Sequence, residues 1–379
     1  MNDENMRASV MLLRFALLAI VSVLAATSAH SQSLTREELR IPMAAAGSDG
    51  LEALLVRPAG SGRHPLMLIN HGSPRNASAR PDMEAQALAP IADEFARRGF
   101  AALVVMRRGY GSSGGGWAES FGQCDDPDYT KAGRAAAADL TAAINHMARQ
   151  SHVDASRIMS VGVSAGGFAT VALTASAPQG FVAAINFAGG RGSLSTDEVC
   201  EEDELVAAMR AFGKTSRVPM LWVYAQNDRF FGPALARKMR DAFTEGGGKA
   251  EFVAAPAHGP DGHTLFSANS IPAWTPYVDR FLAKVSAAPV APAATPRDSA
   301  PAAASRTMSP PSSLSANGKK AFEAYLAAKN HKAFAVASDG SFGWRSGRST
   351  LEEAKQGAMT NCEENGDDCE IVSTNGSSN

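Results

Sequence analysis

One short stretch near the middle of the chain limits the folds open to it more than any other. Ile158–Val163 is an apolar run typical of a buried strand, and Phe168–Thr174 has the small and apolar residues of a packed helix. Between them, Gly162, Ser164 and Gly166 form the pattern G-x-S-x-G. A serine at so sharp a turn adopts a strained backbone and needs glycine neighbours, which leave room for the adjoining chain. The stretch therefore predicts a strand, a tight turn and a helix, with Ser164 exposed at the turn as a candidate nucleophile.

Strands and helices alternate on both sides of this turn. Residues 38–43 and 51–58 are expected to form a hairpin around a glycine-containing turn. Further strands are expected at 66–70, 101–106, 181–187, 219–225 and 250–255, and helices at 83–98, 131–149, 203–212, 233–243 and 274–285. Because several strands are apolar throughout, the fold class is α/β, with a mostly parallel sheet flanked by helices on both faces.

The two ends of the chain have a different character from this central part. Residues 1–31 have two arginines, an apolar core and a small-residue end, which predicts a signal peptide and export to the periplasm or beyond; a retained anchor is the alternative. The catalytic domain is expected at 32–285. Residues 286–316 are rich in Ala, Pro and Ser and predict a linker, and residues 317–379 predict a small module of unknown role.

If the protein is exported, its four cysteines are expected to form two disulfides, because an oxidising compartment favours such bridges. Cys362 and Cys369 are close in sequence, which predicts a local bridge that would staple the small module. Cys124 and Cys200 are then left to pair, with free thiols as the alternative. Neither Cys124 nor Cys200 has the paired spacing or the nearby histidine of a zinc site.

A serine nucleophile needs a base, and the base needs an orienting acid. In this architecture they follow in the order serine, acid, histidine, on loops after later strands. Asp228 follows an apolar strand and His263 follows the last one, so they are the predicted acid and base. His258 is the competing base and Asp261 the competing acid; Asp228 could instead cap the next helix.

The negative charge that develops during acyl transfer needs backbone N–H donors. Ala165, directly after the serine, is the first candidate, and Ser73, in the loop after the strand at 66–70, is the second. His71 in the same loop is interpreted as a partly buried brace rather than a catalytic group. Tyr110 is assigned either a phenolic donor role or simple packing.

The sequence predicts no metal and no cofactor. Gly109–Gly114 matches a dinucleotide fingerprint formally, but no helix is expected to follow it, so the segment is interpreted as a loop. The formal net charge of −2 gives no argument for a nucleic-acid partner or for an anionic membrane surface. The expected partner is a small-molecule ester, with no membrane association once the signal is removed. The oligomeric state is not predicted.

These motifs together resemble the α/β-hydrolase superfamily, and within it the dienelactone-hydrolase-like and prolyl-peptidase-like serine esterase branch. The resemblance covers about residues 51–285, and its carriers are Asn70–Pro74, Arg108–Gly114, Gly162–Gly167, Ala225–Asp228 and Asp261–His263. It implies the α/β-hydrolase fold and a Ser-Asp-His triad. Dienelactone hydrolases typically use a cysteine, so the serine here favours a general carboxylesterase.

Three functions remain open from the sequence. The first is an exported serine hydrolase that cleaves carboxylic esters through an acyl-enzyme. The second is a peptidase or acyltransferase with the same triad, and the third a binding protein on a hydrolase scaffold. A modest lid is expected from residues 115–128 and 199–213, tied together if Cys124 and Cys200 bridge.

Overall fold

The protein is described by a computed structural model that covers residues 33–287, 310–328, 331–348, 350–375 and 377–378. The chain divides into two compact units, residues 1–293 and 294–379. The predicted signal peptide and most of the predicted linker lie outside the described residues. Within the described residues, no helix has both the length and the apolarity needed to cross a bilayer.

The first unit is built on an eight-stranded sheet with the order β1-β2-β4-β3-β7-β8-β11-β12. Strands β1 and β2 form the predicted antiparallel hairpin, β2 pairs antiparallel with β4, and the remaining neighbours are parallel. The strands are β1 (Leu34–Ile41), β2 (Leu51–Pro58), β3 (His64–Asn70), β4 (Ala101–Val105), β7 (Val153–Val163), β8 (Phe181–Phe187), β11 (Pro219–Ala225) and β12 (Lys249–Ala255). The predicted mostly parallel sheet is therefore confirmed.

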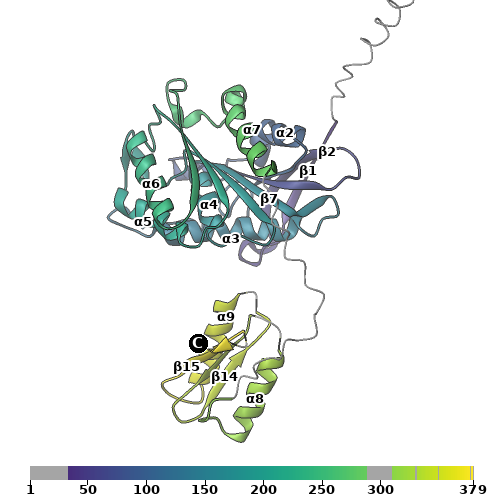
Figure 1. The fold of residues 1–379 in the computed structure, drawn as a ribbon, viewed down its shortest axis with the longest axis vertical. Coiled ribbons are helices and arrows are strands. Elements are labelled where there is room, and N and C mark those ends of the chain that lie inside the picture. Colours follow the sequence, from purple (N-terminus) through teal and green to yellow (C-terminus); the bar gives the residue numbers. More distant parts are fainter. Residues whose placement is uncertain (1–32, 288–309, 329–330, 349, 376, 379) are drawn as a thin grey trace, which may run out of the picture. The chain divides into compact units, whose positions relative to one another are not determined.

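Helices cover both faces of this sheet, as expected (Figure 1). One apolar core lies beneath α2 and α7, and the other beneath α3, α4, α5 and α6. The helices are α2 (Ala89–Arg97), α3 (Tyr129–Met147), α4 (Ala165–Thr174), α5 (Glu202–Gly213), α6 (Pro233–Glu245) and α7 (Ile271–Ala287). Short 3-10 turns are η1 (Ala44–Asp49), η2 (Ala77–Ala79), η3 (Ala85–Leu88), η4 (Gly262–Thr264) and η5 (Ala268–Ser270).

Two small hairpins were not predicted from the sequence. They are β5 (Gly122–Gln123) with β6 (Asp126–Pro127), and β9 (Ser193–Ser195) with β10 (Glu198–Val199). The predicted Cys124–Cys200 disulfide is confirmed, and it ties the first hairpin to the loop after the second. Because the bridge closes a loop of 76 residues, it removes much conformational freedom from the unfolded chain.

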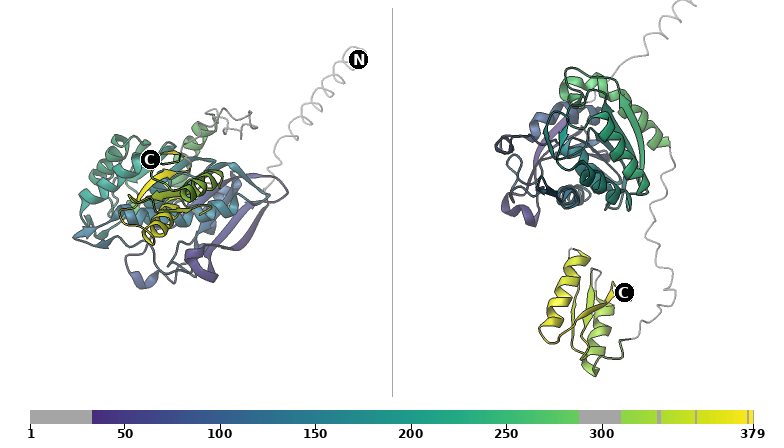
Figure 2. Two further views of the ribbon diagram at one scale, coloured as in Figure 1. Left: turned by 90° about the horizontal axis from the view of Figure 1, so that it is seen from below. Right: turned by 90° about the vertical axis from the view of Figure 1, so that its left-hand side faces the viewer.

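The second unit is a four-stranded antiparallel sheet with one helix on each side of the strands (Figure 2). Its elements are α8 (Ala316–Ala327), β13 (Ala333–Val336), β14 (Phe342–Arg345), α9 (Leu351–Glu363), β15 (Glu370–Thr374) and β16 (Ser377–Ser378). Leu314 packs with Phe322 on the α8 side, so the core of the module begins before residue 317. The predicted Cys362–Cys369 disulfide is confirmed, and it staples the end of α9 to the approach to β15.

Candidate active site

Ser164 lies at the turn between β7 and α4, as the sequence predicts. Its backbone has φ 56° and ψ −125°, a conformation that an L-residue adopts only under strain. A Cβ at Gly162 would lie 2.2 Å from the carbonyl oxygen of Gly166, and one at Gly166 would lie 2.2 Å from that of Asn70. Both glycines are therefore required by the close approach of backbone to backbone.

Asp228 and His263 are brought together from two loops that follow β11 and β12. Nδ1 of His263 lies 3.1 Å from Oδ2 and 3.2 Å from Oδ1 of Asp228. The Asp228 side chain is fully buried, whereas that of His263 is 12% exposed. Asp228 Oδ1 also accepts the backbone N–H groups of Phe230 and Phe231, so the carboxylate is held in place by its own loop.

The two competing residues have other partners in the structure. His258 Nε2 lies 2.7 Å from Oγ of Ser270. Asp261 Oδ1 accepts the backbone N–H groups of Arg229 and His263, which joins the acid and base loops. Asp228 does not cap α6, because the residue at that cap is Gly232 and no side chain bonds there.

Gly262, the residue before His263, is closely packed. A Cβ at this position would lie 2.5 Å from Cβ of Ala225 and 2.6 Å from Oδ1 of Asn227. The residue before His263 must therefore be glycine, because the loop packs directly on the end of β11. This close packing fixes the distance between the histidine and Asp228.

Ser164 and His263 line the same cavity, which has a volume of about 560 Å³. Much of its wall is apolar, formed by Pro74, Met83, Ala87, Leu88, Met106, Val163, Phe230 and Phe266. Charged side chains are also present, namely Arg75, Asp82 and Glu84. Among the described residues that line it, none comes from 115–128 or 199–213, so the predicted lid segments do not form the wall. Most of the wall comes from the segment between β3 and α2, and the rest from residues at or beyond the ends of β4, β7, β11 and β12.

The loop after β3 lies against the turn that carries Ser164. Asn70 pairs with Gly162 at the ends of β3 and β7, and a Cβ at Gly72 would lie 3.3 Å from Cβ of Ser164. Ser73 therefore lines the cavity next to Ser164. Ala165 is the first residue of α4, where backbone N–H groups have no partner within the helix. The structure thus places Ser73 and Ser164 in the wall of one cavity, with Ala165 directly after Ser164.

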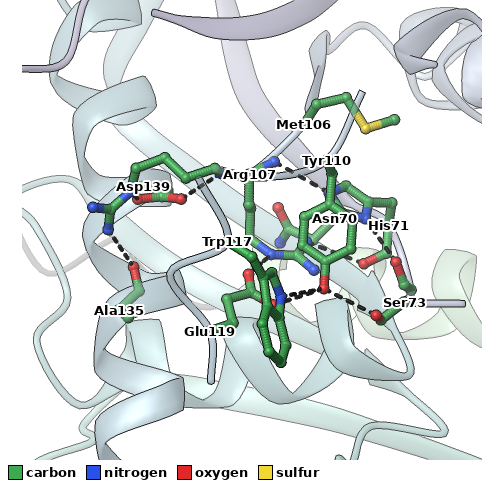
Figure 3. A network of polar contacts seen from close by, with 12 residues as sticks. Asn70, His71, Ser73, Met106, Arg107, Tyr110, Trp117, Glu119, Ala135 and Asp139 are labelled. Atoms are coloured by element: carbon green, nitrogen blue, oxygen red, sulfur yellow. Dashed lines mark hydrogen bonds and ion pairs between the residues drawn. The ribbon is translucent and has the colours of Figure 1, made fainter. Parts of the chain in front are cut away.

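A buried polar network fixes this loop from behind (Figure 3). Glu119 forms ion pairs with Arg107 and Arg191, and all three side chains are at most 5% exposed. Arg107 Nη1 donates to the carbonyl oxygen of His71 at 3.0 Å. The backbone N–H of Arg107 donates to Nε2 of His71 at 3.2 Å. The network therefore holds the loop by its backbone.

Tyr110 belongs to this network and is fully buried. Its hydroxyl lies 2.9 Å from Oγ of Ser73 and 3.2 Å from Oε2 of Glu119, and it accepts the Trp117 indole N–H (Figure 3). Tyr110 is not among the residues that line the cavity. The position of Tyr110 differs from both predicted roles, a phenolic donor and simple packing, because its hydroxyl bonds to Ser73, Glu119 and Trp117 behind the cavity wall.

His71 is the buried brace that the sequence suggested. Its Nδ1 lies 2.7 Å from the Gly72 carbonyl oxygen, so Nδ1 carries the proton and Nε2 accepts from Arg107. Burial, together with the nearby Arg107 charge, lowers the pKa of His71 from 6.5 to about 3. The ring is therefore neutral across the neutral pH range.

This lowered pKa predicts a loss of stability in mild acid. Because the unfolded chain binds a proton at His71 below pH 6.5 and the folded chain does not, stability falls as the pH falls from 6.5 towards 3. Between pH 7.5 and pH 5 the loss from this residue is about 2 kcal/mol. Urea denaturation of the wild type and of His71→Gln at both pH values measures it. Equal pH dependence in the two proteins would contradict the assignment.

Several residues of the site were not predicted from the sequence. Phe230 stacks on His263 and Arg75 lies over the Phe230 ring, while Asp82, Met83 and Leu88 form part of the wall. Phe230 follows Asp228 so closely that its position near the acid could have been inferred. Asp82, Met83 and Leu88 could not have been inferred in this way, because they lie before α2 in a segment that contains no motif.

Comparison with known proteins assigns the chain to a family. The model of the prolyl oligopeptidase family matches residues 89–288, which is more than half of the chain. A search of curated proteins finds no match.

Several solved structures are similar to this chain at low sequence identity. A protein described as a dienelactone hydrolase, from Klebsiella pneumoniae, has 17% identity and a TM-score of 0.48, over 67% of this chain and 99% of that one. The acylaminoacyl peptidase of Pyrococcus horikoshii has 14% identity and a TM-score of 0.48, over 66% of this chain and 42% of that one. An esterase of Thermogutta terrifontis has 17% identity and a TM-score of 0.45, over 66% of this chain and 94% of that one. On the match of the family model, the chain belongs to the prolyl oligopeptidase family of serine hydrolases.

Proposed function

We propose that this protein is an exported serine hydrolase that cleaves carboxylic esters through Ser164, His263 and Asp228. The observation that carries the proposal is that Ser164 and His263 line one cavity while Asp228 lies 3.1 Å behind the histidine. The strained backbone of Ser164 adds support, because strain of this kind gathers at functional sites.

The proton transfers follow from the contacts of His263. A carboxylate only accepts hydrogen bonds, so Nδ1 of His263 carries the proton that faces Asp228. Nε2 then has a lone pair available for the Ser164 hydroxyl proton. As Oγ attacks the ester carbonyl, His263 takes this proton and afterwards delivers it to the departing alcohol. Water then attacks the acyl-enzyme by the same route in reverse.

The backbone N–H groups of Ala165 and Ser73 are the proposed donors to the oxyanion. Ala165 begins α4, so the positive end of the helix dipole supports the same charge. The buried ion pairs of Glu119 with Arg107 and Arg191 hold the Ser73 loop in place. Such preorganised donors stabilise a developing charge without reorganisation, and removal of one donor typically costs about 10²–10³-fold in kcat.

The walls of the cavity favour an ester with an apolar group over a polar substrate. Met83, Leu88, Met106 and Phe266 offer dispersion contacts, and methionine adapts to groups of irregular shape. A peptide backbone would bring several amide groups that need hydrogen-bond partners once they leave water. The confirmed disulfides support export, because bridges persist in oxidising compartments.

Labelling and substrate assays together test this proposal. We expect a fluorophosphonate probe to modify Ser164, as mapped by mass spectrometry of the digested protein. We also expect p-nitrophenyl esters to be hydrolysed faster as the acyl chain lengthens from acetate, until the chain no longer fits the cavity. Modification of a different residue, or no labelling of folded protein, would contradict the proposed nucleophile.

A peptidase is the second candidate, and one observation favours it. Asp82 and Glu84 line the cavity, and their carboxylates could pair with the amino group of a peptide N-terminus. Aminoacyl p-nitroanilides tested beside the esters separate the two. Hydrolysis of the anilides with the higher kcat/KM would assign the peptidase activity instead.

A further inference from the structure

Three side chains, one of them the proposed base His263, form a stack. The Phe230 ring lies 3.9 Å from the His263 ring between centroids, with an interplanar angle of 13°. The guanidinium carbon of Arg75 lies over the same Phe230 ring, 3.7 Å from its centroid. Two groups this close to one centroid cannot share a face of the ring. Phe230 therefore lies between Arg75 and His263, and all three line the cavity.

Arg75 and Phe230 are both held by further contacts. Nη2 of Arg75 donates to Oγ of Ser193 at 3.1 Å and to the carbonyl oxygen of Ser195 at 3.2 Å. The backbone N–H of Phe230 donates to Oδ1 of Asp228 at 2.8 Å. The guanidinium is thus tied to the β9–β10 hairpin, and the backbone of Phe230 is tied to the proposed acid.

The contact with Asp228 fixes only one edge of the His263 ring. A ring bonded at Nδ1 can still rotate about that edge, and such a rotation would move Nε2 away from Ser164. A flat aromatic neighbour removes this freedom, because stacking restricts the plane of the imidazole. The guanidinium on the far face holds the phenyl ring in turn.

We propose that Phe230, supported by Arg75, is a positioning residue that holds His263 in the plane from which Nε2 reaches Ser164. The inference rests on the proposed function. It also links the two halves of the site, because Arg75 follows Ser73 in the loop after β3 and Phe230 follows Asp228 in the loop after β11. The stack thereby joins the proposed oxyanion loop to the acid–base pair.

The test compares Phe230→Leu, which cannot stack, with Phe230→Tyr, which can. We expect Phe230→Leu to lower kcat by about 10–100-fold, since small errors in the placement of reacting groups have effects of this size. Phe230→Tyr should remain within about 3-fold of the wild type because it keeps the stacking face. Since Phe230 also lines the cavity, KM can change for a separate reason. The second readout is therefore the rate of phosphonylation by a small fluorophosphonate, which needs the base but few wall contacts.

Phe252→Leu is the matched control. Phe252 also lies near an arginine and a stacked ring, with Arg240 5.4 Å and Tyr224 5.9 Å from its ring, but it does not line the cavity. Its phosphonylation rate should equal that of the wild type. If Phe252→Leu and Phe230→Leu are slowed equally, or if Phe230→Leu reacts at the wild-type rate, the positioning role is overturned.

Arg75→Met provides an independent arm at an exposed position. We expect Arg75→Met alone to slow phosphonylation by about 3–10-fold. Added to Phe230→Leu, it should slow the reaction by less than about 2-fold more, because the effects of substitutions at coupled residues are not additive. If Phe230→Leu fails to fold, a wild-type rate for Arg75→Met overturns the proposal by itself. Failure of the wild type to react at all would instead refute the proposed function.

Discussion

Replacement of Ser164 by alanine is expected to lower kcat for ester hydrolysis by about 10⁶-fold, and His263→Ala should have an effect of similar size. The two residues act as one unit, because the hydroxyl is a poor nucleophile without the base and the base has no substrate proton to take without the hydroxyl. The double variant should therefore be no slower than either single variant. Initial rates of p-nitrophenyl ester hydrolysis, divided by the enzyme concentration calculated from protein mass, give kcat for the two single variants and the double variant.

Ser176→Ala is the control for these variants. Ser176 is an exposed serine just beyond the end of α4, the helix that begins directly after Ser164. Its kcat and its melting temperature should match those of the wild type. If the losses of Ser164→Ala and His263→Ala instead multiply in the double variant, the two residues do not act on one reaction step, and the proposed mechanism is wrong.

Much of the catalytic unit could be predicted from the sequence because its signals are local. The strands are apolar runs, and glycines mark the turn at Ser164. Asp228 and His263 follow late strands, and parallel strands bring their carboxyl ends to one edge of a sheet. These local features were enough to predict the parallel sheet, its two helical layers and both disulfides.

The walls of the cavity could not be predicted in this way, because they depend on which loops meet in three dimensions. The expected lid at 115–128 and 199–213 was wrong in this respect. The Cys124–Cys200 bridge does tie these segments, but Glu119 from the first of them is buried behind the Ser73 loop. The sequence around Glu119 is typical of an ordinary polar loop. No local sequence pattern indicates that a charged side chain will be buried.

Short strands were missed for a related reason. Strand β15 (Glu370–Thr374) is five residues long and has no fully alternating apolar pattern. It is stabilised by pairing with β13 and by the nearby Cys362–Cys369 bridge, both of which are contacts between segments. Strand propensity is a weak guide where tertiary contacts decide the structure.

The buried charge cluster predicts the largest effect on stability. Glu119→Ala is expected to lower the free energy of unfolding by about 3–5 kcal/mol, because it leaves the buried guanidinium groups of Arg107 and Arg191 without their carboxylate. Although burial alone would raise the pKa of Glu119, Arg107 and Arg191 lower it to about 2. The carboxylate therefore contributes fully above pH 4.5, and its contribution is lost as the pH falls from 4.5 towards 2.

Urea denaturation at pH 7.5, followed by circular dichroism with the disulfides intact, measures this loss. The control is Glu245→Ala, which removes the partner of Arg210 in a pair whose side chains are 57% and 47% exposed. Solvent screens such a pair, so its loss should stay below about 1 kcal/mol. Glu119→Gln should fall between the two, because the amide keeps the shape and some hydrogen bonds but not the charge. If Glu119→Ala is no more destabilising than Glu245→Ala, the cluster does not hold the Ser73 loop in place, and the rigidity of the proposed oxyanion donors must have another source.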